Sequence, residues 1–500
     1  MNWKITKNNK PIGIADIPRG NVQQLRNALI NQCRQGKRVV SFFGHPDRKG
    51  MVLFAVLTDD QNSRLLVACA DLGAERAYPS ITPEVPALHL FEREIFEQFG
   101  IEPQGHPWLK PVRYPFRRFD PSQNIGNYPF FRIEGEDIHE VGVGPIHAGI
   151  IEPGHFRFQC RGEKIHHLEI QLGYQHRGVE ELFVGPINPG EPRFKPHLAE
   201  RIAGDSAVAH ATAYAQIMES LARIEVSRRA QAIRAIALEL ERIAVHVGDL
   251  GAISNDIAHL LGSAVFGAIR TAVINTSLSL CGSRFGQGLI RPGGVLYDLD
   301  DELKERMKRT LNKVLEDVIR MSESMLATSS VLSRLEKTGI VTKQQALDIG
   351  LVGPVARASG VAMDTRADHP FGNYRYFPIH KITMPGGDVF ARTFMRYVEI
   401  KQSVNFILEQ LEHFSREGSL SDPVENLMAE GFCVSMVEGW RGEIAHVVLT
   451  DIQGNPVRYK IKDPSFNNWL GLAIAVRNNG ISDFPLCNKS FNLSYSGHDL

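Results

Sequence analysis

The stretch RIAGDSAVAHATAY, from Arg201 to Tyr214, holds the main clue to the fold of this chain. Small apolar residues follow Ser206, and such a segment predicts a helix packed inside the protein. It opens on a Gly-Asp-Ser turn, which is unusual before a tightly packed helix. No Gly or Pro occurs from Ala207 to Val247, a span too long for one typical globular helix. We therefore expect two helices with a break near IEVSRR, residues 224–229.

Length and composition bound the class of protein. A chain of 500 residues with 43% hydrophobic residues predicts two or three globular domains. The 56 basic and 56 acidic side chains cancel, which gives no support for a nucleic-acid partner or a polybasic membrane anchor. The six cysteines are scattered without a CxxC pair, as is typical of buried reduced thiols in a cytosolic protein. We therefore expect no zinc or iron–sulfur site within this chain.

No membrane-targeting signal is evident. The N-terminal MNWKITKNNKPIG lacks the apolar core of a signal peptide, and no uninterrupted apolar run reaches the roughly 18 residues that a membrane span needs. We expect a soluble or peripheral protein that reaches a membrane only through partners.

Local patterns predict an α+β fold. Residues 1–115 are expected to form an α/β domain with a small antiparallel sheet, because a helix capped by Asn21, three β-rich runs and a helix stopped by Gly100 follow one another. Residues 116–140 are rich in Pro, Arg and aromatic residues and predict an extended linker. Residues 141–500 predict a large domain, a bundle of long helices flanked by β segments, with a final hairpin around a Gly-Asn-Pro turn.

The segment LEIQLGYQHRGVEELF concentrates polar side chains at the end of a predicted strand. Tyr174, His176, Arg177 and Glu180 lie within seven residues of one another. A His, an Arg and a Glu at such a turn could transfer protons. The alternative is an ion-pair cluster at the surface or in an interface.

Seven ordered motifs resemble one family. They are VGVGPIHAGIIEPGHFRF, LGYQHRGVEEL, RIAGDSAVAHATAY, ALELERIAVHVGDLGAISNDI, RFGQGLIRPGGV, GLVGPVARASGVAMDTR and DPSFNN. Together they resemble the large-subunit family shared by [NiFe]-hydrogenases and the quinone-site subunit of respiratory complex I, the 49 kDa type. The N-terminal FEREIFEQFGIEPQGHPWLKPVRYPF resembles the end of the 30 kDa-type complex I subunit. Fusion of these two parts is typical of the large subunits of formate hydrogenlyase and hydrogenase-4.

The resemblance identifies four former nickel-ligand positions. In hydrogenases of this family the opening stretch is R-I-C-G-x-C-x-x-A-H, and its cysteines correspond here to Ala203 and Ser206. A second pair, D-P-C-x-x-C, corresponds to Ser494 and Gly497. Nickel in that site needs four thiolates, and Cys487, seven residues before Ser494, cannot rebuild such a set. We predict that this chain binds no nickel–iron centre and no other cofactor by itself.

The complex I relatives use the same cavity for quinone. The Tyr that holds the quinone head group corresponds to Gly204, and its His partner to Ile151, with His155 as the nearest alternative and His147 kept at the start of the loop. A carboxylate below that His corresponds to Asp256. A buried Asp needs a partner, for which Arg242 and His246 are candidates; the alternative is a helix cap or a solvated side chain.

The remaining family positions suggest proton transfer and packing. Glu180 corresponds to a Glu that passes protons away from the metal in hydrogenases, and burial would raise its pKa and suit it to that role. The alternative for Glu180 is a salt bridge to Arg177 or to another Arg. Arg357 and Arg366 are interpreted as structural or pocket-lining, with Asp364 as an ion-pair partner. His210 is either a hydrogen-bonded core histidine or a redox-linked proton carrier, and Gly204 and Asp205 are expected to line the cavity.

Two functions remain open at this stage. The first is a subunit of a complex I or hydrogenase-4-like oxidoreductase, cytoplasmic and peripheral on the membrane. It would dock a small subunit that carries the iron–sulfur cluster and antiporter-like membrane subunits, with quinone as one candidate acceptor. The second is a scaffold that keeps only the fold and the docking surface. A closed apolar pocket would favour the scaffold, whereas an open cavity lined by Asp205, Ser206, Glu180 and His210 would favour chemistry. The chain has no dinucleotide fingerprint after a strand, so direct NADH binding is not expected.

Overall fold

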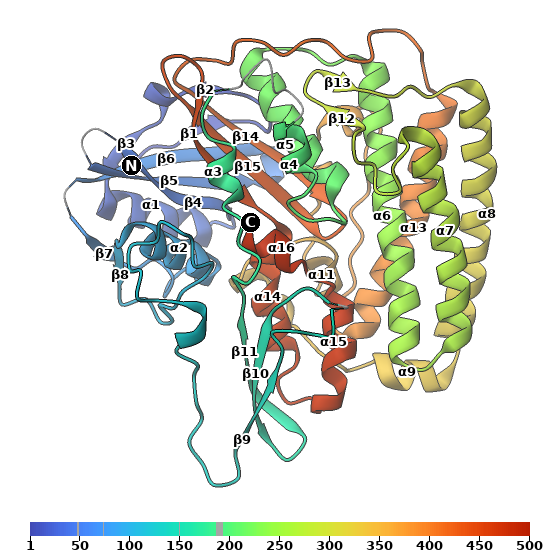
Figure 1. Cartoon of the computed structure of the whole chain (residues 1–500), viewed down its shortest axis with the longest axis horizontal. Helices are drawn as coiled ribbons and strands as arrows, with labels where there is room; N and C mark the ends of the chain where they lie inside the picture. Colours follow the sequence, from blue (N-terminus) through green and yellow to red (C-terminus); the bar gives the residue numbers. More distant parts are fainter. Residues whose placement is uncertain (48–49, 74, 150, 187–193) are drawn as a thin grey trace.

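The N-terminal part of the chain forms a mainly antiparallel sheet, in which β3 alone among the described strands pairs in parallel, and helices cover it (Figure 1). The computed structural model describes residues 1–47, 50–73, 75–149, 151–186 and 194–500. Strands β4 (Arg38–Asp47), β5 (Gly50–Asp59) and β6 (Arg64–Gly73) form the predicted meander, and β1 (Lys4–Thr6) and β3 (Arg19–Asn21) pair with β6. Helices α1 (Val22–Arg34) and α2 (His89–Phe99) share a core with one face of this sheet.

The helix ends predicted for this part are confirmed. Asn21 caps α1, and its side chain and that of Gln24 each accept a hydrogen bond from the other residue's backbone N–H. Helix α2 stops at Gly100, whose φ of 67° lies in the left-handed region that favours glycine.

A second sheet is buried on both faces. Strands β15 (Gly442–Thr450) and β16 (Pro456–Lys462) form the predicted hairpin, β14 (Gly431–Gly439) pairs antiparallel with β15, and β2 (Ile12–Gly13) extends the sheet beside β14. One face packs on the N-terminal sheet, where Phe54 stacks on Phe432 with ring centroids 6.0 Å apart. The other face lies against α5 (Ala207–Ala222). The polar residues that alternate along β16 therefore do not mark a solvent face, because their partners lie inside the protein.

Long helices form the bundle predicted from the sequence (Figure 1). Helix α5 ends before Arg223, and α6 (Arg228–Asp256) begins after Ser227, so the predicted break is confirmed. Helix α6 packs in the bundle with α7 (Leu260–Cys281), α8 (Asp301–Leu326) and α13 (Val389–Glu412). In the described part of the chain, α7 is the one helix that length and composition would allow to cross a membrane, a test that core helices of soluble proteins also pass.

Smaller elements complete the fold. Strands β9 (His139–Val143), β10 (His155–Arg161) and β11 (Lys164–Gln171) form a third antiparallel sheet, which projects at the lower edge of Figure 1. The other short elements are β7 (Ala77–Pro79), β8 (Glu102–Gln104), β12 (Ile290–Arg291), β13 (Gly294–Val295), α3 (Val179–Leu182), α4 (Phe194–Ala199), α9 (Ser329–Leu335), α10 (Lys343–Asp348), α11 (Gly353–Ala358), α12 (Thr365–Asp368), α14 (Pro464–Ala475), α15 (Phe484–Phe491) and α16 (Tyr495–Asp499).

These elements confirm the predicted α+β class. Between Gly105 and Ile138 the only regular element is a short 3-10 helix, Ile125–Asn127. The division of the chain at residues 115 and 140 stays a prediction.

Candidate functional site

The turn before α5 buries two of the former ligand positions. Ala203 is fully buried, and Ser206 is 2% exposed. Ser206 stands at the N-cap of α5, yet its side chain makes no capping hydrogen bond. Its hydroxyl instead accepts a long hydrogen bond from Arg441 Nη1, at 3.4 Å.

The other two positions lie near the end of the chain, against the start of α14. Ser494 caps α16 by accepting a hydrogen bond from the N–H of Gly497 at 2.9 Å, and its own N–H donates to Ser465 Oγ at 2.9 Å. A Cβ at Gly497 would lie only 2.7 Å from Cγ of Asp463. The Asp463 carboxylate thus occupies the space that a cysteine side chain at position 497 would need.

Arg441 joins the two segments. Its Nη2 donates to Asp205 Oδ2 at 2.6 Å, and its Nε donates to the carbonyl oxygen of Asn492 at 2.6 Å. The guanidinium also stacks on the Trp440 ring, 3.9 Å from the centroid. The former ligand segments are therefore held together by a buried cation at the β14–β15 turn.

The residues at the four former ligand positions do not fit a nickel centre. An Ala methyl, two Ser hydroxyls and a Gly hydrogen supply none of the thiolates that such a centre requires. Within the part of the chain that the structure describes, no group of three or more His, Cys, Asp and Glu side chains could hold a metal ion. Cys487 lies on α15 beside Gly339 and Arg392, where burial raises the pKa of its thiol to about 11.

His210 lies at the centre of a buried hydrogen-bonded line. Its Nε2 lies 3.0 Å from Asp463 Oδ2, and its Nδ1 lies 3.1 Å from Nε2 of His446. His446 Nδ1 lies 2.9 Å from the hydroxyl of Tyr459. All four side chains are fully buried. Both possibilities predicted for His210 remain open, because a hydrogen-bonded core histidine with this partner set could also carry a proton.

The polar residues of the QHRGVEE segment contact different partners rather than one another. Glu180 is buried and lies 3.0 Å from Lys460 Nζ, and it accepts a hydrogen bond from the Ile461 N–H at 2.9 Å. Arg177 is not the ion-pair partner of Glu180, since it donates to the carbonyl oxygens of Arg201, Ile202 and Ser496. His176 Nδ1 lies 2.7 Å from the carbonyl oxygen of Asp499. The role of Glu180 in proton relay stays a prediction, and its salt bridges run to Lys460 and, at 3.5 Å, to Arg458.

The structure places Asp205 and Glu180 in separate cavities. Glu180 and His176 line a cavity with an empty volume of about 1400 Å³, which reaches Arg113 and Arg458. Asp205 lines a smaller pocket of about 510 Å³ between α6, α7 and the start of α5. The open cavity expected to join Asp205, Ser206, Glu180 and His210 is therefore not formed by these two spaces.

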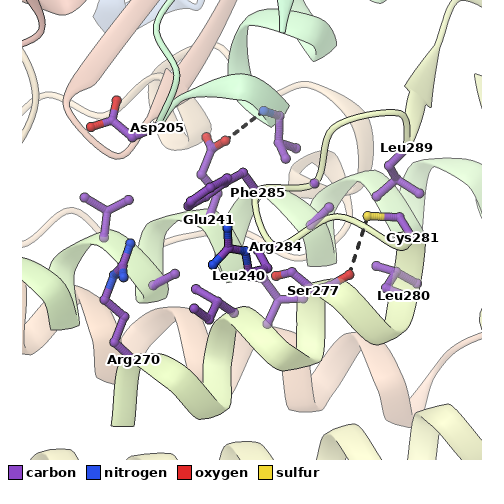
Figure 2. Close-up of a pocket in the computed structure, with 16 residues that line it drawn as sticks. Asp205, Leu240, Glu241, Arg270, Ser277, Leu280, Cys281, Arg284, Phe285 and Leu289 are labelled. Carbon is purple, nitrogen blue, oxygen red and sulfur yellow. Dashed lines mark hydrogen bonds between the residues drawn. The ribbon is translucent and has the colours of Figure 1, made fainter. Parts of the chain in front are cut away.

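Glu241 is the buried acid of the smaller pocket, and sequence reasoning missed it. Its carboxylate accepts hydrogen bonds from the N–H groups of Val208 and Ala209, at 2.7 and 3.3 Å, and so caps α5 in place of Ser206. Figure 2 shows it among apolar side chains, with Asp205 and Arg270 at the edges of the pocket. Burial raises the pKa of Glu241 to about 8, and the nearby Asp205 charge adds to the effect.

The family-pattern arginines form a buried ionic cluster. Arg366 donates to Asp364 at 2.7 Å and to Glu239 at 3.0 Å, whereas Arg357 donates to Glu399 and Glu438, each at 2.8 Å. The interpretation of Asp364 as an ion-pair partner agrees with this geometry. Burial opposes its charge, but Arg366 and Arg357 lower the pKa of Asp364 to about 2. The cluster also contains Arg242 and His246.

Asp256 has neither of the partners suggested for it. It lies exposed at the C-terminal end of α6, whereas Arg242 and His246 pair with Glu399, at 3.6 and 2.9 Å. The solvated alternative describes its position. Burial of part of the side chain still raises the pKa of Asp256 above its ordinary value.

The histidines at the loop between β9 and β10 lie within hydrogen-bonding distance of backbone oxygens of the same loop. His147 Nε2 lies 2.9 Å from the carbonyl oxygen of Gly154, and His155 Nδ1 lies 3.1 Å from that of Gly144. Ile151 is 45% exposed. Gly204 has open space where a Cβ would stand. None of these residues therefore supplies the Tyr and His side chains that would hold a quinone head group.

Known families match most of the chain. The family described as respiratory-chain NADH dehydrogenase, 49 Kd subunit, matches residues 256–430 and 423–499. The family described as respiratory-chain NADH dehydrogenase, 30 Kd subunit, matches residues 16–119. The two matches lie in the order expected from the sequence motifs.

Individual proteins agree with this assignment. Formate hydrogenlyase subunit 5 of Escherichia coli K12 is 31% identical over 499 residues, covering 93% of this chain and 85% of that protein. Hydrogenase-4 component G of the same organism is 32% identical over 470 residues, covering 90% and 80%. A chain in the structure of the membrane-bound sulfane sulfur reductase, an archaeal respiratory membrane complex, shares the fold with a TM-score of 0.67 and 23% identity, covering 74% of this chain and all of that chain.

The relatives include both hydrogenase subunits and NADH-quinone oxidoreductase subunits. The matches to the two hydrogenase subunits, which cover 93% and 90% of this chain, extend over the N-terminal sheet as well as the helix bundle. The chain therefore belongs to the family of complex I 49 Kd-type and hydrogenase large subunits, with a 30 Kd-type domain fused ahead of the 49 Kd-type domain.

Proposed function

We propose that this chain is a nickel-free subunit of a membrane-associated oxidoreductase complex related to complex I and hydrogenase-4. In this proposal it couples electron transfer to ion translocation. It docks a small subunit that holds the iron–sulfur cluster, and antiporter-like subunits that span the membrane. The chain itself lies on the cytoplasmic side, attached to the membrane through these partners. The names of its relatives support a complex of this kind.

One observation carries the nickel-free part of the proposal. Where a cysteine at position 497 would reach into the site, the carboxylate of Asp463 is packed against Gly497 and bonded to His210. A thiolate at that place would displace a fully buried ion-pair or hydrogen-bond partner of the histidine. The space between the former ligand segments is thus filled by polar protein atoms.

The same filling favours chemistry over a scaffold. Burying titratable groups costs desolvation free energy, and a scaffold would keep such a space closed more cheaply with Leu or Phe. Here Asp463, His210 and Arg441 occupy it, and each is hydrogen-bonded. Asp463 and His210 can hold and move a proton beside the site, which apolar residues cannot do.

The experiment is to purify the native complex and measure its metals and its reactions. We expect iron and sulfide from the partner subunit, nickel far below one atom per complex, and reduction of quinone or another small acceptor by a low-potential donor. Stoichiometric nickel would refute the nickel-free proposal. A complex without iron–sulfur clusters that reduces neither quinone nor protons would favour the scaffold instead.

A matched pair of variants connects this activity to the site. Asp463→Asn removes the charge but keeps a side chain that can cap α14, so the helix should be retained. We expect it to lower acceptor reduction by about 10²-fold or more, the usual worth of a positioned proton-transfer group. Asp451→Asn, in the turn between β15 and β16, is the control and should leave the rate unchanged.

A further inference from the structure

Four buried side chains from four elements form one continuous line of hydrogen bonds. Tyr459 comes from β16, His446 from β15, His210 from α5, and Asp463 from the residue before α14. The successive contacts measure 2.9, 3.1 and 3.0 Å. All four residues are fully buried, so none of these bonds competes with water at the surface.

The ionised carboxylate fixes the direction of every bond. Asp463 Oδ1 accepts from the Ser465 N–H at 2.7 Å, and Oδ2 faces His210. Burial opposes the charge, but the hydrogen bond from His210 and the electrostatic attraction of His210 and then Arg441 hold the pKa of Asp463 below its ordinary value. An ionised carboxylate can only accept, so His210 donates from Nε2.

The rest of the line follows from the two nitrogens of each ring. With a proton on Nε2, a neutral His210 accepts at Nδ1, so His446 must donate from its own Nε2. His446 then accepts at Nδ1 from the Tyr459 hydroxyl. Three donors therefore point the same way, from Tyr459 toward Asp463.

This line can run in a second, reversed state that holds one more proton. Two of the three protons move one place: the Tyr459 hydroxyl proton passes to His446 Nδ1, and the His446 Nε2 proton passes to His210 Nδ1. The His210 Nε2 proton stays in its bond to Asp463. The step needs one new proton at the fully buried Tyr459 hydroxyl, to replace the one that Tyr459 gave up. The result is an imidazolium at His210 beside the Asp463 carboxylate, with no tyrosinate left behind. One proton gained balances the charge of one electron arriving nearby.

We propose that Tyr459, His446, His210 and Asp463 form a store for one proton beside the reaction site, loaded when an electron reaches that site and emptied when the acceptor is protonated. This inference rests on the proposed electron-transfer function. His446 and Tyr459 act through His210 and are positioning and relay residues. Asp463 sets the direction of the line.

Asp463→Asn provides a sharp test, because the amide should reverse the whole line. The Ser465 N–H still needs an acceptor, so the Asn oxygen faces Ser465 and its NH₂ group donates to His210 Nε2. His210 and His446 must then both carry their protons on Nδ1. Ring-¹⁵N-labelled histidine in the intact complex reports this tautomer by solid-state NMR, and His210→Gln and His446→Gln assign the two signals.

We expect both rings as Nε2–H in the native complex and both as Nδ1–H in Asp463→Asn. Asp451→Asn is the control, since Asp451 bonds the backbone of its own turn between β15 and β16 and should leave both signals unchanged. The proposal would be overturned by an Nδ1–H tautomer of either ring in the native complex, or by tautomers of His210 and His446 that do not change in Asp463→Asn. This readout does not depend on turnover, so it separates failure of the store from failure of the proposed function.

Proton uptake on reduction tests the store itself. A pH indicator should record one proton per complex on addition of a low-potential donor to native protein, and no such proton in Asp463→Asn. Tyr459→Phe should slow the uptake by about 10²-fold or more, because the first relay group is lost. Tyr128→Phe, which removes a buried hydroxyl bonded to Glu169, is the control and should keep the native rate. Unchanged uptake in both Asp463→Asn and Tyr459→Phe would refute the store.

Discussion

Glu241 makes the stability of this protein depend on pH in an unusual direction. Its carboxylate caps α5 from α6 inside an apolar pocket, and its pKa is raised to about 8. The folded protein therefore holds a proton that the unfolded chain releases near an ordinary Glu pKa of about 4.3. Below that value both states are protonated and Glu241 contributes no pH dependence. Stability falls as pH rises toward 8 and levels off above it.

The magnitude follows from the shift. Between the two pKa values, the free energy of unfolding falls by about 1.4 kcal/mol for each pH unit. It therefore falls by about 3 kcal/mol between pH 5.5 and 8. An unfolding entropy of about 2.1 cal/mol/K per residue gives about 1 kcal/mol/K for a chain of this length. The melting temperature should therefore fall by about 3 °C over this range because of Glu241 alone.

Glu241→Gln keeps an oxygen acceptor for the Val208 N–H but cannot ionise. Calorimetry of both proteins from pH 5.5 to 8.5 should show the variant gaining about 3 °C on the native protein as pH rises. Glu316→Gln, whose native side chain on α8 is 67% exposed, is the control and should follow the native curve. Curves that stay parallel for Glu241→Gln would refute the reasoning, because they would mean that Glu241 is already ionised in the folded state.

Two further substitutions test the packing of the site. Arg357→Ala should lower the free energy of unfolding by about 3–5 kcal/mol, because it leaves buried carboxylates unpaired. Chemical denaturation measures this loss. The control is Arg161→Ala, at an exposed ion pair, which should lower the free energy of unfolding by less than about 1 kcal/mol. Gly497→Ala forces a Cβ against Asp463 and should destabilise by about 1–3 kcal/mol in the same assay, whereas Gly204→Ala meets no atom within 4 Å and should change little. Equal effects within either pair would contradict the geometry.

The elements of this fold could be predicted because their signals are local. Helix α5 is marked by a long run without Gly or Pro, and α1 and α2 by a capping Asn and a terminal Gly. What local patterns could not supply was the burial of the second sheet on both faces. The polar residues of β16, Arg458, Lys460 and Lys462, alternate as they would on a solvent face, and only contact with the rest of the protein shows otherwise.

Individual residues of the site could be predicted from the sequence, but not which of them lie together. The family resemblance singled out His210, and DPSFNN contained Asp463, but the two are 253 residues apart and nothing in the sequence joined them. His446 and Tyr459 lie on strands without any motif of their own. Asp256 shows the opposite case. The family resemblance predicted a buried carboxylate at this position, but the Asp256 side chain is exposed.

The β14–β15 turn connects the buried ionic cluster to the proton line. On one side Arg242 donates to the carbonyl oxygens of Glu438 and Gly439, at 2.7 and 3.1 Å, and so fixes the strand leading into the turn. On the other side Arg441, two residues beyond Gly439, holds Asp205 and lies near Asp463. A cluster that shifted would move Arg441 with the turn and change the charge felt by Asp463. We therefore expect Arg242 to affect this site by position, through the backbone carbonyls of Glu438 and Gly439, and its loss should alter proton uptake even where the fold survives.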